Sequence, residues 1–353
     1  VISVVTASPD VGGEIGGYVQ TGYEFETEEY AIEGALNLPI GDRFAVRLAG
    51  KYSDSNGYIT NTGLNRTEPA TEDVILRGSA IWEPTDNLTI ELKGTYSSLE
   101  ANSALDFELI NCVPRASVAQ LGCTNADGTP MDNILNRVRA TDLDEFRTVD
   151  SYIGSLNINY EFGDGYNLTS TTGYYDLESE FLIDLDISTA PSNVAATRAG
   201  LNQRDFADQF SQELRLSSPT GGGLEWTIGG YFQDEQASFQ NFLLFGLSPL
   251  PPLPPAVAAM LPPPGFNGAF TSQESQQYSV FGSATVNISD RFRVTAGLRY
   301  VDVHKDVSQT PFTPGLLPAD GIPNIDNFRI IPALPAALFA AQTQSRTDDD
   351  FLP

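Results

Sequence analysis

The chain has 353 residues and a formal net charge of −27, with 46 acidic side chains against 19 lysines and arginines. An acidic surface repels a polyphosphate backbone, which argues against nucleic acid as a partner. Only 18 % of the residues are charged, and no run of about 18 apolar residues occurs, so no transmembrane helix is predicted. Abundant glycine, tyrosine, phenylalanine and threonine favour strands and turns over helices.

Alternation of apolar and polar residues with a period of two recurs along the chain and indicates β-strands. In one such segment, Val46 and Leu48 fall on one face and Arg47 on the other. In chain order we predict 11 strands, at residues 15–25, 30–38, 44–54, 71–83, 88–98, 149–162, 166–177, 205–218, 224–239, 276–288 and 291–302. The predicted fold class is all-β.

The connections between these strands are of two kinds. Short ones rich in glycine, proline, aspartate and asparagine are typical of tight hairpin turns and fall at residues 39–43, 84–87, 163–165, 219–223 and 289–290. Long ones span residues 55–70, 99–148, 178–204, 240–275 and 303–345. Because short and long connections alternate after the first hairpin, we predict an antiparallel meander with all its long loops at one end. Bacterial outer-membrane barrels have this arrangement.

The apolar face of the strands is bordered by aromatic residues near the strand ends, as at a membrane interface. These residues are Tyr52, Trp82, Tyr96, Phe162, Tyr166, Trp226, Phe292 and Tyr300. The opposite face carries arginine, lysine, glutamate, serine, threonine and asparagine, which a hydrated interior would solvate. We therefore predict part of a transmembrane β-barrel with long extracellular loops and short periplasmic turns. A soluble β-sandwich or β-helix is the alternative.

Several segments resemble the TonB-dependent receptor family. The most similar is Phe210–Pro219 together with the Gly-Gly-Tyr-Phe motif at 229–232, and 278–282 and 295–300 add to it. Residues 1–9 resemble the last strand of the family's plug domain, and 348–353 resemble the start of a further strand. The resemblance implies that residues 1–10 are the end of a plug and residues 11–353 a partial barrel.

The same resemblance implies a function. About 11 of the family's 22 strands would be present, so the sequence is interpreted as the N-terminal half of the barrel, with the start of the protein missing. Family membership implies uptake of a scarce nutrient, often a ferric siderophore, across the outer membrane of a Gram-negative bacterium. Its partners would be TonB, reached through the missing plug segment, and outer-membrane lipid and lipopolysaccharide. A passive porin-like channel and a soluble β-rich binding protein are the alternatives.

Six cations on the polar face are candidate lumen-facing residues: Arg47, Lys51, Arg77, Lys93, Arg293 and Arg299. Within this family they would contact an anionic ferric complex or the plug, or alternatively pair with nearby wall or plug carboxylates. The acidic residues of the long connections, including Asp144, Glu145 and Asp184, are interpreted as solvated surface, with binding of divalent ions as the alternative.

Chemistry of other kinds has little support in the sequence. Cys112 and Cys123 are the only cysteines and lie in the longest loop, which suits a disulfide in an oxidising compartment; two free thiols are the alternative. His304 is the only histidine and is interpreted as a solvated loop residue. No phosphate-binding glycine loop or zinc-ligand spacing occurs. We expect no catalytic site, no metal site and no cofactor.

Overall fold

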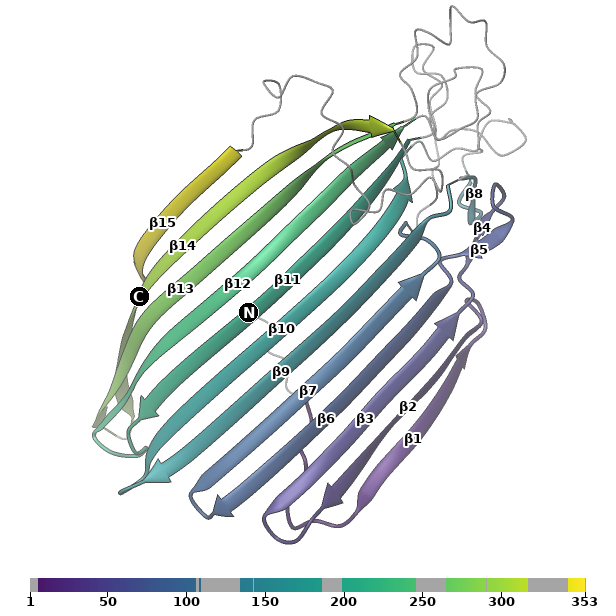
Figure 1. The fold of residues 1–353 in the computed structure, drawn as a ribbon. Helices are drawn as coiled ribbons and strands as arrows, with labels where there is room; N and C mark the ends of the chain where they lie inside the picture. Colours follow the sequence, from purple (N-terminus) through teal and green to yellow (C-terminus); the bar gives the residue numbers. More distant parts are fainter. Residues whose placement is uncertain are drawn as a thin grey trace, which may run out of the picture.

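The computed structural model describes residues 6–105, 108, 134–141, 143–185, 199–245, 265–289, 291–316 and 342–352. They form a large sheet of 12 strands and a small sheet of three (Figure 1). The large sheet contains β1 (Gly16–Glu24), β2 (Glu29–Pro39), β3 (Phe44–Ser55), β6 (Thr71–Thr85), β7 (Leu88–Ala101), β9 (Phe146–Phe162), β10 (Tyr166–Asp184), β11 (Ala199–Ser217), β12 (Leu224–Phe245), β13 (Gly265–Ser289), β14 (Phe292–Leu316) and β15 (Gln342–Leu352). The small sheet contains β4 (Ile59–Asn61), β5 (Arg66–Glu68) and β8 (Val138–Arg139).

The large sheet is an antiparallel meander in which each strand pairs with the next strand of that sheet along the chain, β4, β5 and β8 being set aside in the small sheet. All 11 predicted strands are present, and β15 adds a twelfth where the sequence resembles the start of a further strand. Within the described residues β1 and β15 are the two edges, so the sheet does not close on itself. The prediction of an antiparallel meander forming part of a barrel is confirmed.

The strands are longer than predicted at the end that carries the long connections, called the loop end below. The sequence places a connection at 240–275, but β12 continues to Phe245 and β13 begins at Gly265. Likewise β14 runs to Leu316 and not to residue 302. An alternating sequence pattern arises only where one face of a strand is apolar, whereas the ladder of backbone hydrogen bonds needs only a neighbouring strand. Pairing therefore continues where both faces are polar and the sequence pattern has ended.

The small sheet lies within two connections that the sequence indicates as loops, 55–70 and 99–148. β4 pairs antiparallel with β5 and parallel with β8, and the three strands gather at the loop end of the large sheet (Figure 1). Strands of two or three residues are too short to show a period in the sequence. Here side-chain contacts between distant segments determine the structure.

The strand register keeps each side chain of the meander on one of two faces. Leu36 lies opposite Leu48, which lies opposite Gly78, followed by Gly94 and Gly154 on the next strands. We call the face that carries this row, formed by even-numbered residues from β2 to β14, the outer face. The other face is the inner face. The period of two in the sequence thus corresponds to two surfaces of one sheet.

The large sheet is a single layer, with its large apolar side chains uncovered on the outer face. Leu48, Leu76 and Leu92 are 52 %, 54 % and 55 % exposed. A continuous apolar surface of this size requires an apolar medium or a partner. A soluble two-layer sandwich would bury these rows against a second sheet, so the structure does not support that alternative. No helix in the described part of the chain is long and apolar enough to cross a bilayer.

Two aromatic belts border the apolar band of the outer face. The loop-end belt contains Tyr30, Tyr52, Tyr96, Tyr152, Phe210, Phe232 and Tyr278, whose rings meet in neighbouring pairs, 4.9 Å apart between Tyr96 and Tyr152. The turn-end belt contains Tyr160, Phe162, Tyr166 and Trp226. Tyr152 and Phe162 are ten residues apart on β9, which corresponds to a height of about 26 Å across the membrane for a strand tilted by ~40°. This spacing is close to the ~25 Å apolar band of outer-membrane barrels.

Candidate functional site

The segment before β1 lies against the inner face, which it crosses on its way to the sheet edge (Figure 1). The backbone N–H of Asp10 donates to Asn37 Oδ1 at 2.9 Å, and Asn37 Nδ2 donates to the carbonyl of Asp10 at 3.3 Å. Farther along, Lys93 Nζ donates to Ser8 Oγ at 3.0 Å. Two strands of the wall, β2 and β7, therefore hold this segment on the inner face.

All six predicted lumen-facing cations lie on the inner face by register. Four of them, Arg47, Lys51, Arg77 and Lys93, gather on the neighbouring strands β3, β6 and β7, and we call these four the basic wall patch. Arg293 and Arg299 lie far across the sheet on β14. The structure therefore separates the six candidates into two groups.

The partners of the basic wall patch are mostly neutral. Arg77 Nε donates to Thr95 Oγ1 at 2.9 Å. Lys93 Nζ lies 2.9 Å from Glu91 Oε1 and is the one member of the patch with a carboxylate partner among the described residues. Within this part of the chain Lys93 therefore has a wall carboxylate as its partner. For Arg47, Lys51 and Arg77 the contacts expected from the sequence stay predictions.

Arg299 lies between two aromatic rings of the inner wall. Its guanidinium carbon is 5.6 Å from the ring centroids of both Tyr231 and Phe281, and its Nη2 donates to Ser279 Oγ at 2.7 Å. The Phe281 ring occupies the space above Gly229, where an added Cβ would meet Phe281 Cζ at 2.4 Å. Cation–π contacts and a close-packed ring thus hold this arginine against the wall.

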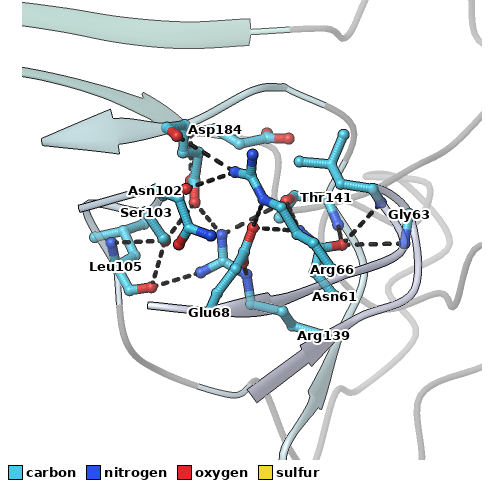
Figure 2. A network of polar contacts seen from close by, with 12 residues as sticks. Asn61, Gly63, Arg66, Glu68, Asn102, Ser103, Leu105, Arg139, Thr141 and Asp184 are labelled. Carbon is cyan, nitrogen blue, oxygen red and sulfur yellow. Dashed lines mark hydrogen bonds and ion pairs between the residues drawn. The ribbon is translucent and has the colours of Figure 1, made fainter. Parts of the chain in front are cut away.

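A cluster of buried charges lies at the loop end and includes side chains of the small sheet itself, Arg66 and Glu68 of β5 and Arg139 of β8 (Figure 2). Arg139 is 1 % exposed and forms ion pairs with Glu68, also fully buried, and with Glu145. Arg66 Nε lies 2.6 Å from Glu68 Oε1. Because charged groups are rarely buried without partners, these contacts account for their burial. We call these residues, with Asn61, Thr141 and Asp184, the outer polar cluster.

The outer polar cluster connects three loop-forming segments. Asn61 Nδ2, at the end of β4, donates to Thr141 Oγ1 at 2.7 Å, and the backbone N–H of Thr141 donates to Asn61 Oδ1 at 3.2 Å. The backbone N–H of Asp184, at the end of β10, donates to Glu145 Oε1 at 2.8 Å. The connections from β3 to β6 and from β7 to β9 are thereby joined to each other and to β10.

A family model described as "TonB dependent receptor-like, beta-barrel" matches residues 116–353. This chain belongs to the TonB-dependent receptor family. Its large sheet is also similar to solved receptor structures, although identities this low show similarity of fold alone.

One such structure is the ferric yersiniabactin uptake receptor FyuA from Yersinia pestis, with a TM-score of 0.65 and 13 % identity over 98 % of this chain and 44 % of that one. Another is the ferric-catecholate import receptor Fiu from E. coli K12, with a TM-score of 0.63 and 12 % identity over 98 % of this chain and 52 % of that one. A third is the siderophore receptor PiuA from Acinetobacter baumannii, with a TM-score of 0.63 and 12 % identity over 97 % of this chain and 47 % of that one. The chain spans about half the length of these structures.

Within this TonB-dependent receptor domain, the interpretation of Glu145 and Asp184 as solvated surface is wrong. Both are at most 2 % exposed. Glu145 accepts a hydrogen bond from the backbone N–H of Asp184, and Asp184 Oδ2 accepts one from the backbone N–H of Leu143. Burial raises the pKa of Glu145 above its usual range, although Arg139, the Asp184 N–H and the Ser103 hydroxyl oppose that effect. Asp144 is exposed as expected, beside Arg66. Arginines inside acidic loops are the sequence signal that could have indicated the cluster.

The interpretation of His304 as a loop residue is also wrong. It lies within β14, which extends beyond its predicted end, and its ring nitrogens contact Thr347 Oγ1 at 2.8 Å and Asp306 Oδ2 at 3.1 Å. The predicted disulfide between Cys112 and Cys123 lies outside the described residues. No group of three or more metal-ligating side chains occurs within the described residues of the receptor domain.

Proposed function

We propose that the full-length protein imports a scarce nutrient across the outer membrane of a Gram-negative bacterium in a TonB-dependent manner, and that its cargo is a ferric siderophore or another iron complex. The observation that carries the proposal is the family match over residues 116–353 on an unbroken 12-stranded meander. The apolar outer face with its aromatic belts suits contact with outer-membrane lipid and lipopolysaccharide. The inner face suits a hydrated interior.

We further propose that residues 1–10 are the end of a plug domain and that residues 11–353 form part of the barrel that surrounds it. The hydrogen bonds of Ser8 with Lys93 and of Asp10 with Asn37 support this division, since they place the segment before β1 on the inner face. TonB would act on the protein through the plug. The proposed role is transport, with no catalytic step.

Uptake of iron-55 complexes in cells tests this proposal. A strain that lacks the gene is compared with one that expresses the full-length protein, using anionic, neutral and cationic ferric chelates. We expect the protein to restore accumulation of at least one chelate, and a protonophore or loss of TonB to abolish that accumulation. Accumulation that persists without TonB would indicate the porin-like alternative. A protein that restores no accumulation of any chelate would overturn the proposal.

A further inference from the structure

One row of inner-face residues crosses four neighbouring strands, β2, β3, β6 and β7. Its members lie opposite one another in the register and are Asn37, Arg47, Ser79 and Lys93. The segment before β1 contacts both ends of this row, because Ser8 accepts a hydrogen bond from Lys93 and Asp10 bonds with Asn37. Residues 8–10 therefore follow the row across the strands.

The segment lies close against the wall at this row. Pro9, between the two contact residues, is buried. Three small inner-face side chains of this row and of the rows beside it are also at most 8 % exposed: Ala35, Ala45 and Ser79. Such short side chains leave room for a second stretch of chain. The hydrogen bonds between Asp10 and Asn37 are thus formed away from bulk water, where they are electrostatically stronger.

The side chain of Asn37 pairs with both backbone groups of a single residue. The N–H of Asp10 donates to Asn37 Oδ1 at 2.9 Å, and Asn37 Nδ2 donates to the carbonyl of Asp10 at 3.3 Å. Two residues of an antiparallel ladder exchange both hydrogen bonds in the same way. An asparagine can do this because its amide carries a donor and an acceptor. Asn37 therefore binds the backbone of Asp10 much as a neighbouring strand would.

The turn that follows begins at the same residue. A Cβ added to Gly13 would lie 2.4 Å from Asp10 Oδ2, so the carboxylate lies over the turn. Gly12 has a φ of +71°, which glycine adopts without steric cost. The chain then enters β1 at Gly16, which lies opposite Asn37 in the register. Asn37 thus lies where the segment leaves the inner face and the wall begins.

We propose that Asn37 is a positioning residue that anchors the end of the plug to the barrel wall, so that Asp10 stays in place while TonB rearranges the rest of the plug. This inference rests on the proposed function and adds a specific residue to it. Residues 10–15 would span up to about 20 Å if they left the wall and straightened. Without the anchor, the plug would shift as a body into this slack before it rearranged, and each pull would import less cargo.

Hydrogen exchange in the purified full-length receptor tests the anchor itself. Asn37→Leu removes both hydrogen bonds at similar side-chain volume. We expect the Asp10 amide to exchange about 5–25-fold faster in this variant, for one or two lost hydrogen bonds at about fivefold each. Asn159→Leu is the matched control, because Asn159 is an inner-face asparagine of β9 that accepts a hydrogen bond from Thr169. The control should leave the exchange of Asp10 unchanged.

Uptake of the iron-55 chelate that the wild-type receptor imports tests the role in transport. We expect Asn37→Leu to lower the uptake rate about fivefold or more, with binding of the chelate at the cell surface unchanged. Asn37→Asp, which keeps the acceptor and loses the donor, should give an intermediate rate, and Asn159→Leu the wild-type rate. A disulfide between Asp10→Cys and Asn37→Cys should also leave uptake at the wild-type rate, because the two positions remain together throughout transport.

Three results would overturn the inference while leaving the proposed function intact. They are unchanged exchange of Asp10 in Asn37→Leu, wild-type uptake by that variant, and uptake that the disulfide blocks and a reducing agent restores. If Asn37→Leu does not fold, Asn37→Asp and the disulfide decide in the same way, by wild-type uptake in the first or blocked uptake in the second. If the wild-type receptor imports no chelate, the proposed function fails first and the inference fails with it.

Discussion

At the scale of single residues, the inner face shows why particular side chains occupy its crowded positions. Gly229 is the clearest case, since the Phe281 ring lies where any larger residue would place its Cβ. That ring in turn contacts the guanidinium of Arg299. One glycine on β12 therefore determines how an aromatic ring and a cation on two further strands are arranged.

We predict that Gly229→Ala destabilises the folded receptor by about 1–3 kcal/mol, the usual cost of overpacking. The added Cβ would lie 2.4 Å from Phe281 Cζ and 2.9 Å from the carbonyl of Leu214, so the ring cannot relieve the contact alone. Gly94→Ala is the control, because a Cβ at Gly94 has no atom within 4 Å. Urea unfolding of the full-length protein in lipid measures the difference. Equal stabilities of the two variants would contradict the prediction.

A second residue-scale prediction concerns Arg139 in the outer polar cluster. Arg139→Leu leaves Glu68 and Glu145 buried without their shared cation. Breaking a buried ion pair in this way costs about 3–5 kcal/mol, and we expect protease cleavage within residues 56–70 and 134–145 to increase strongly. Arg43→Gln, which breaks an exposed pair with Asp86 at the turn end, should leave cleavage unchanged. Equal resistance to the protease in the Arg139→Leu and Arg43→Gln variants would show that the outer polar cluster does not stabilise these loops.

At the scale of elements, the strands of the meander continue beyond the loop-end aromatic belt. On β13, Glu274 lies beyond the belt and Val280 within the apolar band of the same outer face. We predict that a membrane-impermeant maleimide labels Glu274→Cys in intact cells and leaves Val280→Cys unlabelled, with labelling of the wild type subtracted. Labelling of both positions would place the membrane elsewhere on the sheet.

The long strands could be predicted from the sequence, whereas the short strands of the small sheet could not. Alternation and turn spacing predicted the 11 strands of the large sheet from β1 to β14, because hydrocarbon and a hydrated interior favour opposite residues at successive positions, as at Arg47 and Leu48. β15 is indicated only by the resemblance of residues 348–353 to the start of a further strand. The alternating pattern ends beyond the loop-end belt. There, successive residues such as Gln273 and Glu274 lie on opposite faces of the sheet and are both polar. Alternation also missed β4, β5 and β8, whose positions depend on contacts between Asn61 and Thr141 across 80 residues. The outer polar cluster follows from such contacts and leaves no periodic signal.

At the scale of the whole molecule, the large sheet has one apolar and one polar face and encloses no conventional hydrophobic core among the described residues. Few large apolar side chains are buried among the described residues, Phe242 being the largest. Stability in this arrangement depends on lipid around the outer face and on ladders of backbone hydrogen bonds within the sheet. Among the described residues β1 and β15 are the edges of the sheet, and unpaired backbone groups at an edge are very unfavourable in lipid.

The proposed transport role requires that the outer face meet hydrocarbon and that the inner face meet a polar interior. Spin labels placed one at a time at residues 45–52 of β3, in the full-length protein reconstituted in lipid, test it most directly by their accessibility to oxygen and to a water-soluble nickel complex. We predict a period of two, with high oxygen accessibility at Val46, Leu48 and Gly50 and low values at Ala45, Arg47 and Ala49. A profile without alternation, or with the opposite phase, would contradict it.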